Sequence, residues 1–117
     1  MNITGITFVS IYGAVKGADE IIFTTISGHK YKMWHEQNCC EAVQLDDLIG
    51  DISDLLNSPI LSYEEVSNSE NQPTKNTESW TWTFYKFQTA KGFVTLRWLG
   101  ESNGYYSEKV TFRKIEQ

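Results

Sequence analysis

Residues 80–99 read WTWTFYKFQTAKGFVTLRWL and contain the pattern that decides the fold. Aromatic and β-branched side chains alternate with polar ones, which is typical of strands with one buried face. Ala90, Lys91 and Gly92 interrupt the alternation and form a tight turn. The pattern therefore predicts two antiparallel strands, over residues 80–89 and 93–99.

A third strand is predicted directly after this hairpin. Asn103 and Gly104 are a strong hairpin signal because both residues tolerate positive φ. Residues 105–115 follow, and their Val110 and Phe112 fall on the face that meets the apolar side chains of the second strand. The C-terminal third is therefore predicted to be a three-stranded antiparallel meander.

Three further strands are predicted near the N-terminus. Residues 6–12, 21–27 and 29–34 are rich in β-branched and aromatic side chains. The short turns between these segments favour antiparallel hairpins. Most of the chain outside its middle is thus expected to be antiparallel sheet.

The middle of the chain, residues 34–73, differs in composition. It has nine carboxylates and no Lys or Arg, whereas the flanking segments carry small positive charges. Leucine and isoleucine follow helical spacing on one face across residues 45–56, and Gly50 interrupts them. We expect a short helix over residues 51–57, leave residues 41–49 open between helix and strand, and expect a strand over residues 60–66.

These elements predict an α+β fold dominated by antiparallel sheet, with one or two short helices in the central segment. The 117 residues are expected to form one domain, since a chain of this size can bury a sufficient core. Residues 67–78 are polar, contain Pro73 and are expected to be a mobile loop.

Charge and composition exclude several classes of protein. The net charge of −5 argues against direct nucleic-acid binding, and no apolar run is long enough to span a membrane. The first residues lack the basic start and apolar core of a secretory signal. Cys39 and Cys40 are adjacent, so a bridge between them would be strained, and free thiols in a reducing cytosol are expected.

Two motifs carry a resemblance to a known family. One is His35-Glu36-Gln37-Asn38-Cys39-Cys40-Glu41, and the other is Ser102-Asn103-Gly104-Tyr105-Tyr106-Ser107. From about His35 onward the chain resembles a small family of uncharacterised proteins found in tailed bacteriophages and in bacterial genomes. The resemblance implies a phage or prophage setting and the cytoplasm of a bacterial host. It assigns no activity and no catalytic residue.

His35, Cys39 and Cys40 are the residues with the most reactive chemistry in the chain. On a helix, His35 and Cys39 would share a face, but a zinc site needs further ligands that the sequence does not supply at a matching spacing. A Cys–His hydrolase would also need an oxyanion site, for which the sequence has no signature. Buried structural thiols are the favoured interpretation, with no metal or cofactor expected and no catalytic residue assigned.

The residues expected to bind a partner fall into two groups. Nine carboxylates without a local cation should attract a basic surface. Tyr105 and Tyr106 are adjacent, so on a strand only one can face the core while the other faces solvent beside Asn103. The predicted binding residues are Asp46, Asp47, Asp51, Asp54, Arg97, Asn103, Tyr105 and Tyr106.

Three functional hypotheses follow. The first is a non-enzymatic phage accessory protein that binds a basic host macromolecule through its acidic surface and inhibits an antiviral defence enzyme. The second is a small-ligand binder, such as a sponge for a nucleotide signal, held by the aromatic hairpin with Arg97 or Lys109. The third is a hydrolase that uses Cys39 or Cys40 with His35. The sequence does not define the oligomeric state.

Overall fold

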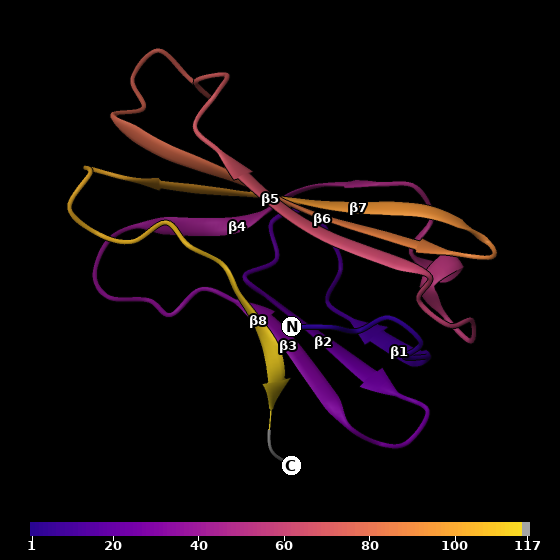
Figure 1. The fold of residues 1–117 in the computed structure, drawn as a ribbon. Coiled ribbons are helices and arrows are strands. Elements are labelled where there is room, and N and C mark those ends of the chain that lie inside the picture. The colour runs from indigo at the N-terminus through magenta and orange to yellow at the C-terminus, as the bar shows by residue number, and fades with distance from the viewer. Residues whose placement is uncertain (116–117) are drawn as a thin grey trace.

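The computed structural model describes residues 1–115, which form two four-stranded antiparallel sheets stacked on each other (Figure 1). The first sheet has the order β1-β2-β3-β8, with Phe8–Tyr12 (β1), Glu20–Thr25 (β2), Lys30–Trp34 (β3) and Thr111–Ile115 (β8). The second has the order β4-β7-β6-β5, with Ala42–Ile49 (β4), Gly92–Ser102 (β7), Ser79–Thr89 (β6) and Ser62–Asn68 (β5).

The prediction of an α+β fold is wrong in its helical part, because the described residues are all-β apart from one short 3₁₀ helix, η1 (Ile52–Leu55). The expected helix over residues 51–57 is reduced to this turn. Residues 41–49, which the sequence left open between helix and strand, contribute the eight-residue strand β4. Predominance of antiparallel sheet is confirmed.

A β-bulge explains why this segment resembles a helix in sequence. The pairing of β4 with β7 shifts between Leu45 and Asp47, where one extra residue enters β4. Val43 and Leu45 face the core two residues apart, and Leu48 follows after three. Spacings of two and three residues in one strand imitate the apolar spacing of a helix.

Gly50 ends β4 for a steric reason. Its φ is +98°, and a Cβ at this position would lie 2.5 Å from the carbonyl oxygen of Phe93. Asp51 then begins η1, since its carboxylate accepts hydrogen bonds from the backbone N–H and the hydroxyl of Ser53. The glycine that interrupts the helical pattern therefore marks the end of a strand.

The predicted hairpin over residues 80–99 is confirmed as β6 and β7, but the three-stranded meander is wrong. The second neighbour of β7 is β4, and the third predicted strand lies in the other sheet, where β8 pairs with β3. Asn103 and Gly104, whose φ is +94°, turn the chain into a crossover rather than a hairpin. The side chain of Asn103 accepts a hydrogen bond from the N–H of Tyr105 within this turn.

The N-terminal strands and the strand predicted over residues 60–66 are present, with shifted ends. β1, β2 and β3 pair as the expected antiparallel hairpins. β5 continues to Asn68, so the polar loop begins two residues later than predicted and spans residues 69–78. The mobility of this loop stays a prediction.

Aromatic side chains from both sheets form the core. Phe23 of β2 contacts Phe87 of β6 and Phe112 of β8, with ring centroids 6.2 Å and 5.2 Å apart. The indole N–H of Trp98 on β7 donates to the sulfur of Met33 on β3 at 3.0 Å. All these side chains are buried, so they join the two sheets into one core.

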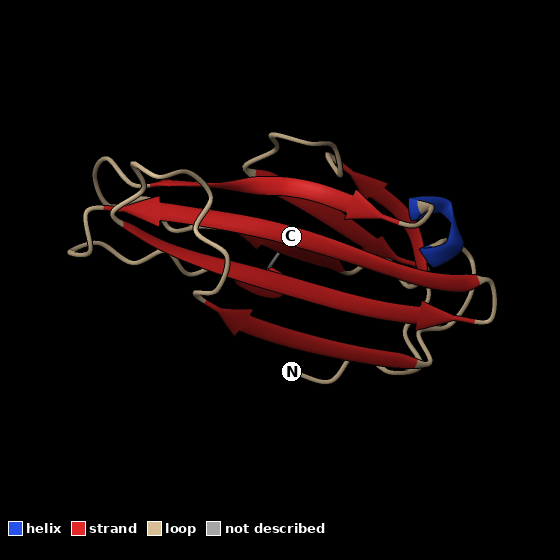
Figure 2. Cartoon of the chain, turned by 90° about the horizontal axis from the view of Figure 1, so that it is seen from above, coloured by secondary structure: helices blue, strands red, loops and turns tan. Residues whose placement is uncertain are grey.

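Figure 2 shows that the long strands of the second sheet end in two different environments. η1 lies at one end of the molecule, and a group of loops lies at the opposite end. Among residues 1–115, no helix is long and apolar enough to cross a membrane.

Candidate functional site

Arg97 joins two of the predicted acidic residues in the middle of β7. Its guanidinium donates to a carboxylate oxygen of Asp46 from Nε at 3.1 Å and from Nη2 at 2.7 Å. Asp47 lies 3.7 Å from the same Nη2. The bulge in β4 brings both carboxylates to this cation, so Arg97 partly neutralises the pair.

The other two predicted aspartates lie elsewhere. Asp51 caps η1, and the hydrogen bonds from Ser53 lower the pKa of its carboxyl group. Asp54 lies next to Gly92, at the start of β7. Gly92 is five residues from Arg97, which corresponds to roughly 16 Å along a strand. The four predicted aspartates therefore do not share one surface but form two groups.

Asp46 and Arg97 belong to a larger surface, the outer face of the β4-β7-β6-β5 sheet. The guanidinium of Arg97 stacks over the ring of Trp82 at 5.2 Å. Side chains alternate along each strand, so this face also carries neighbours of Trp82 at every second position. Its apolar members are Ile49, Val66, Trp80, Trp82, Phe84, Phe93 and Leu99.

The outer face is open to solvent at several of these positions. Phe93 is 72 % exposed and Ile49 is 47 % exposed, although both are large apolar side chains. The same face carries four carboxylates and two cations. The carboxylates belong to Asp46, Asp47, Glu64 and Glu101, and the cations to Arg97 and Lys86. Large exposed apolar patches with a polar rim are rare on monomeric proteins, and they mark interaction sites.

The three remaining predicted residues lie at the opposite end of β7 from Asp54, in the crossover that follows Ser102. Tyr105 is 83 % exposed, and its ring meets the ring of Tyr106 edge-on at 5.0 Å. Asn103 holds the turn through its bond to the N–H of Tyr105. Asn103, Tyr105 and Tyr106 thus lie together, but apart from the Asp46–Arg97 group.

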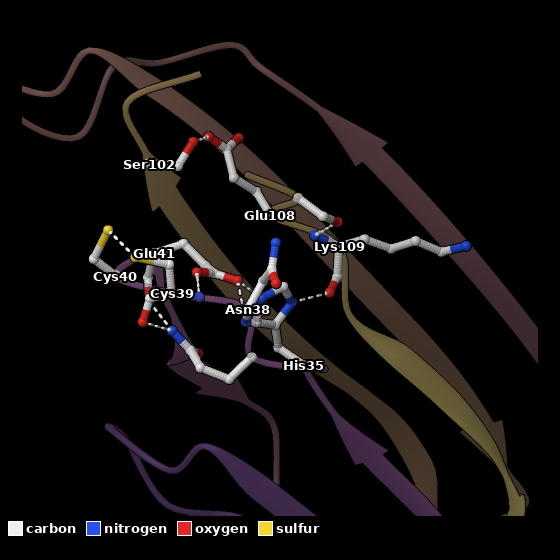
Figure 3. Close-up of polar contacts among 10 residues, drawn as sticks. His35, Asn38, Cys39, Cys40, Glu41, Ser102, Glu108 and Lys109 are labelled. Carbon is white, nitrogen blue, oxygen red and sulfur yellow. Dashed lines mark hydrogen bonds and ion pairs between the residues drawn. The ribbon is translucent and has the colours of Figure 1, made fainter. Parts of the chain in front are cut away.

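His35 and Glu41 form a buried pair beneath this loop (Figure 3). His35 Nε2 donates to Glu41 Oε2 at 2.7 Å, and Nδ1 donates to the carbonyl of Lys109 at 2.6 Å. Both ring nitrogens therefore face oxygen atoms, and the ring joins Glu41 to the backbone of the crossover. The hydrogen bond with His35 and, after it, the backbone N–H groups of Cys39 and Asn38 together lower the pKa of Glu41 to about 2.

Cys39 and Cys40 lie on the surface next to this pair. Both side chains are exposed, and their sulfur atoms are 2.8 Å apart. The expectation of buried structural thiols is therefore wrong, whereas free thiols are present. His35 and Cys39 do not share a helix face, since residues 35–41 form a loop between β3 and β4.

The geometry does not favour a Cys–His nucleophile. Neither nitrogen of His35 faces a thiol, because both donate to other oxygens. The hydrogen bond with Cys39 raises the pKa of the Cys40 thiol, which disfavours the reactive thiolate. Within residues 1–115, no group of three or more His, Cys, Asp or Glu side chains is placed to hold a metal ion.

An open depression of about 440 Å³ lies beside Cys40 at the loop end of the molecule. Its wall contains the carboxylates of Glu41, Glu78 and Glu101 and no Lys or Arg side chain. The polar residues that complete it are Thr74, Asn76, Thr77, Ser102 and Asn103. A negatively charged ligand would meet carboxylates there without a compensating cation. The depression therefore suits a neutral or cationic group better than a nucleotide.

Two features of these surfaces were not found from the sequence. Trp82 was not among the predicted binding residues, yet it faces outward and stacks with Arg97. Glu41 was counted among the solvated carboxylates, yet it is buried. The alternation of residues 80–89 identifies two faces but does not say which is buried, and no local signal distinguishes Glu41 from its neighbours.

The fold and these surfaces define a small antiparallel β-sandwich with a partly exposed aromatic sheet face and a compact polar loop end. Residues 2–112 match the family described as a domain of unknown function, DUF7448, and the chain belongs to this family. No curated protein matches the chain, and no solved structure does. The resemblance to an uncharacterised family is confirmed in this respect, while its phage setting stays a prediction.

Proposed function

We propose that this chain is a non-enzymatic binding protein that attaches to a basic macromolecule through the outer face of the β4-β7-β6-β5 sheet. The observation that carries the proposal is the row formed by Asp46, Arg97 and Trp82 at the centre of that face. Tryptophan and arginine are enriched among residues that dominate binding energy in protein interfaces. The setting implied by the resemblance is the cytoplasm of a bacterial host, with inhibition of a host defence enzyme as the specific role.

The charge around this row favours a basic partner. Four carboxylates and two cations surround the aromatic centre, and Arg97 already bonds Asp46. The surplus negative charge would speed the encounter with a positive surface, as on a protein that binds phosphates. The acidic run as a whole does not support the proposal, because Asp51 and Asp54 are separated from this row.

The two alternative functions have less support. For a nucleotide sponge, the depression near Asn103 has no cation in its wall, and Arg97 is held by Asp46. For a hydrolase, His35 has no nitrogen available to a thiol. A thermal-shift screen against nucleotides tests the first, since a ligand bound to the folded state raises the unfolding temperature.

The proposal is tested by capture from bacterial lysate with the wild type and three variants, in a series of salt concentrations. W82A removes the aromatic centre, and D46N/D47N removes two charges beside Arg97. D19N/E36Q removes two exposed charges outside this face and is the matched control. The expected result is a basic protein whose binding weakens with salt and at least tenfold in W82A, but stays unchanged in the control.

Equal capture by all four proteins would contradict the proposal. A further variant, D46N/D47N/D51N/D54N, neutralises the entire predicted acidic set. If D46N/D47N and this fourfold variant weaken binding equally, the outer face accounts for the effect. If binding needs only Asp51 and Asp54, the partner attaches near η1 and the outer-face proposal fails.

A further inference from the structure

Cys39 and Cys40 present their two sulfur atoms on the same side of the chain, 2.8 Å apart. Adjacent side chains on an extended strand point in opposite directions, so convergence of neighbouring side chains requires a special bend. Both thiols are exposed. The bend between β3 and β4 therefore offers one incoming atom two sulfur ligands at once.

Hydrogen bonds of the Glu41 carboxylate and of the Gln37 side-chain amide fix the conformation of this bend (Figure 3). The Glu41 carboxylate accepts the N–H groups of Asn38 and Cys39, each at 2.9 Å. The side-chain amide of Gln37 donates to the carbonyls of Cys39 and Glu41, at 3.2 Å and 2.6 Å. Glu41 is itself fixed by His35, so the positions of both thiols are set before any ligand arrives.

The surroundings of Cys40 favour a thiol that stays protonated until it reacts. The hydrogen bond with Cys39 raises the pKa of the Cys40 thiol, and contact with Cys39 also raises the pKa of the Tyr106 hydroxyl. A protonated thiol is a poor nucleophile, but condensation with a hydroxylated metalloid does not require a thiolate, because each thiol proton leaves with a hydroxyl group.

We propose that Cys39 and Cys40 form a chelating site for trivalent arsenic compounds, a class that binds pairs of thiols. Two S–H bonds and two As–O bonds break, two As–S bonds form, and two water molecules leave. Arsenic stays trivalent, so the step needs no oxidant or reductant. The depression beside Cys40, about 440 Å³ in volume, has room for the third substituent of the arsenic atom.

The number of ligands separates this class from ordinary metal ions. Structural zinc sites use four protein ligands, and catalytic zinc sites use three with water. No cluster of three or more ligating side chains exists within residues 1–115, and His35 is occupied by Glu41 and Lys109. An arsenic atom with one organic substituent needs only two sulfur atoms, which is the number that this bend supplies.

The test uses phenylarsine oxide as the probe and the reduced full chain. Intact-mass spectrometry is expected to show one phenylarsenic group per chain, with both thiols lost to thiol titration. C39S and C40S each retain one thiol and are expected to bind at least 100-fold more weakly. The wild type is also expected to bind at least tenfold more tightly folded than in urea, because the bend positions both sulfur atoms.

Gln37→Ala keeps both thiols but removes one support of the bend, and Glu36→Gln is its matched control on an exposed neighbour. Gln37→Ala is expected to weaken binding several-fold, and Glu36→Gln is expected to leave it unchanged. Equal affinity of C39S and the wild type would overturn the proposal, and so would equal affinity of folded and unfolded chains. If zinc at the same concentration displaces phenylarsine oxide, the thiols bind a metal ion and the arsenic proposal fails.

Discussion

His35 and Lys109 are 74 residues apart in the sequence, yet the His35 ring donates a 2.6 Å hydrogen bond from Nδ1 to the Lys109 carbonyl. This bond joins the loop before β4 to the crossover that leads into β8. Through Glu41, the same ring also orders the bend that carries the thiols. Residues 35–41 and the crossover after Ser102 thus meet at one end of the sandwich.

Acidification is expected to weaken the fold through Glu41. The pKa of this carboxyl group is about 2 in the folded state against 4.5 as its ordinary value. The stabilisation from its ionised form is therefore complete above pH 4.5 and is lost as the pH falls from 4.5 toward 2. Urea unfolding of wild type and Glu41→Gln from pH 7 to pH 2.5 measures this loss.

Glu41→Gln is expected to be less stable at neutral pH, and the difference from wild type should shrink as the pH falls through this window. Glu36→Gln serves as the control, since Glu36 is an exposed carboxylate in the same loop. A difference between Glu41→Gln and wild type that stays constant down to pH 2.5 would show that the Glu41 charge does not stabilise the fold.

Phe87 and Phe93 provide a direct comparison of the two faces of the β6–β7 hairpin. Phe87 is 1 % exposed and packs against Phe23, whereas Phe93 is 72 % exposed on the outer face. Phe87→Ala is expected to lower the free energy of unfolding by about 3–5 kcal/mol, which is the usual cost of this change in a core. Phe93→Ala is expected to change it by less than about 1 kcal/mol.

Urea denaturation with matching m-values measures both variants. A cost for Phe93→Ala as large as that for Phe87→Ala would mean that the outer face is covered in solution. A dilution series of the wild type then shows whether a second copy provides the cover.

Gly100 allows the crossover to approach β7. A Cβ at this position would lie 2.5 Å from the carbonyl oxygen of Glu108 and 2.7 Å from its Cβ. Gly100→Ala is therefore expected to destabilise the fold by about 1–3 kcal/mol and to release Glu108 from Ser102 and Thr81. Gln44→Ala, on the neighbouring strand β4, is expected to stay within about 0.5 kcal/mol of wild type.

Chemical denaturation and amide exchange of residues 107–110 measure these effects. Exchange should become faster in Gly100→Ala and stay unchanged in Gln44→Ala. A Gly100→Ala variant with wild-type stability and unchanged exchange would show that the crossover can move away without cost.

Local patterns in the sequence were sufficient to predict the pairing of strands that follow one another directly along the chain. The hairpin of β6 and β7 was predicted because alternation and a tight turn are short-range signals. The helical spacing of leucine and isoleucine that begins at Leu45 was misleading, because the bulge near Asp46 gives β4 an apolar spacing that a helix also produces. A one-residue insertion in the pairing of two strands leaves no distinct mark on either strand alone.

The strand that pairs with β8 and the burial of Glu41 beside His35 both depend on contacts between residues that are distant in the sequence. Val110 and Phe112 alternate in the same way whether their strand joins β7 or β3, so the pattern predicts an inward face but not the neighbour. The sequence shows Glu41 as one of nine carboxylates, and only its position beside His35 distinguishes it. Both features depend on long-range packing, which local propensity does not determine.

The position of β8 has a consequence for the synthesis of the chain. The first sheet takes its fourth strand from residues 111–115, although its other three strands lie within the first 34 residues. While translation continues, β3 has no partner on that side, and its free edge can pair with other chains. The sandwich can therefore close only after residues 111–115 have left the ribosome, and nascent chains will need protection from aggregation until then.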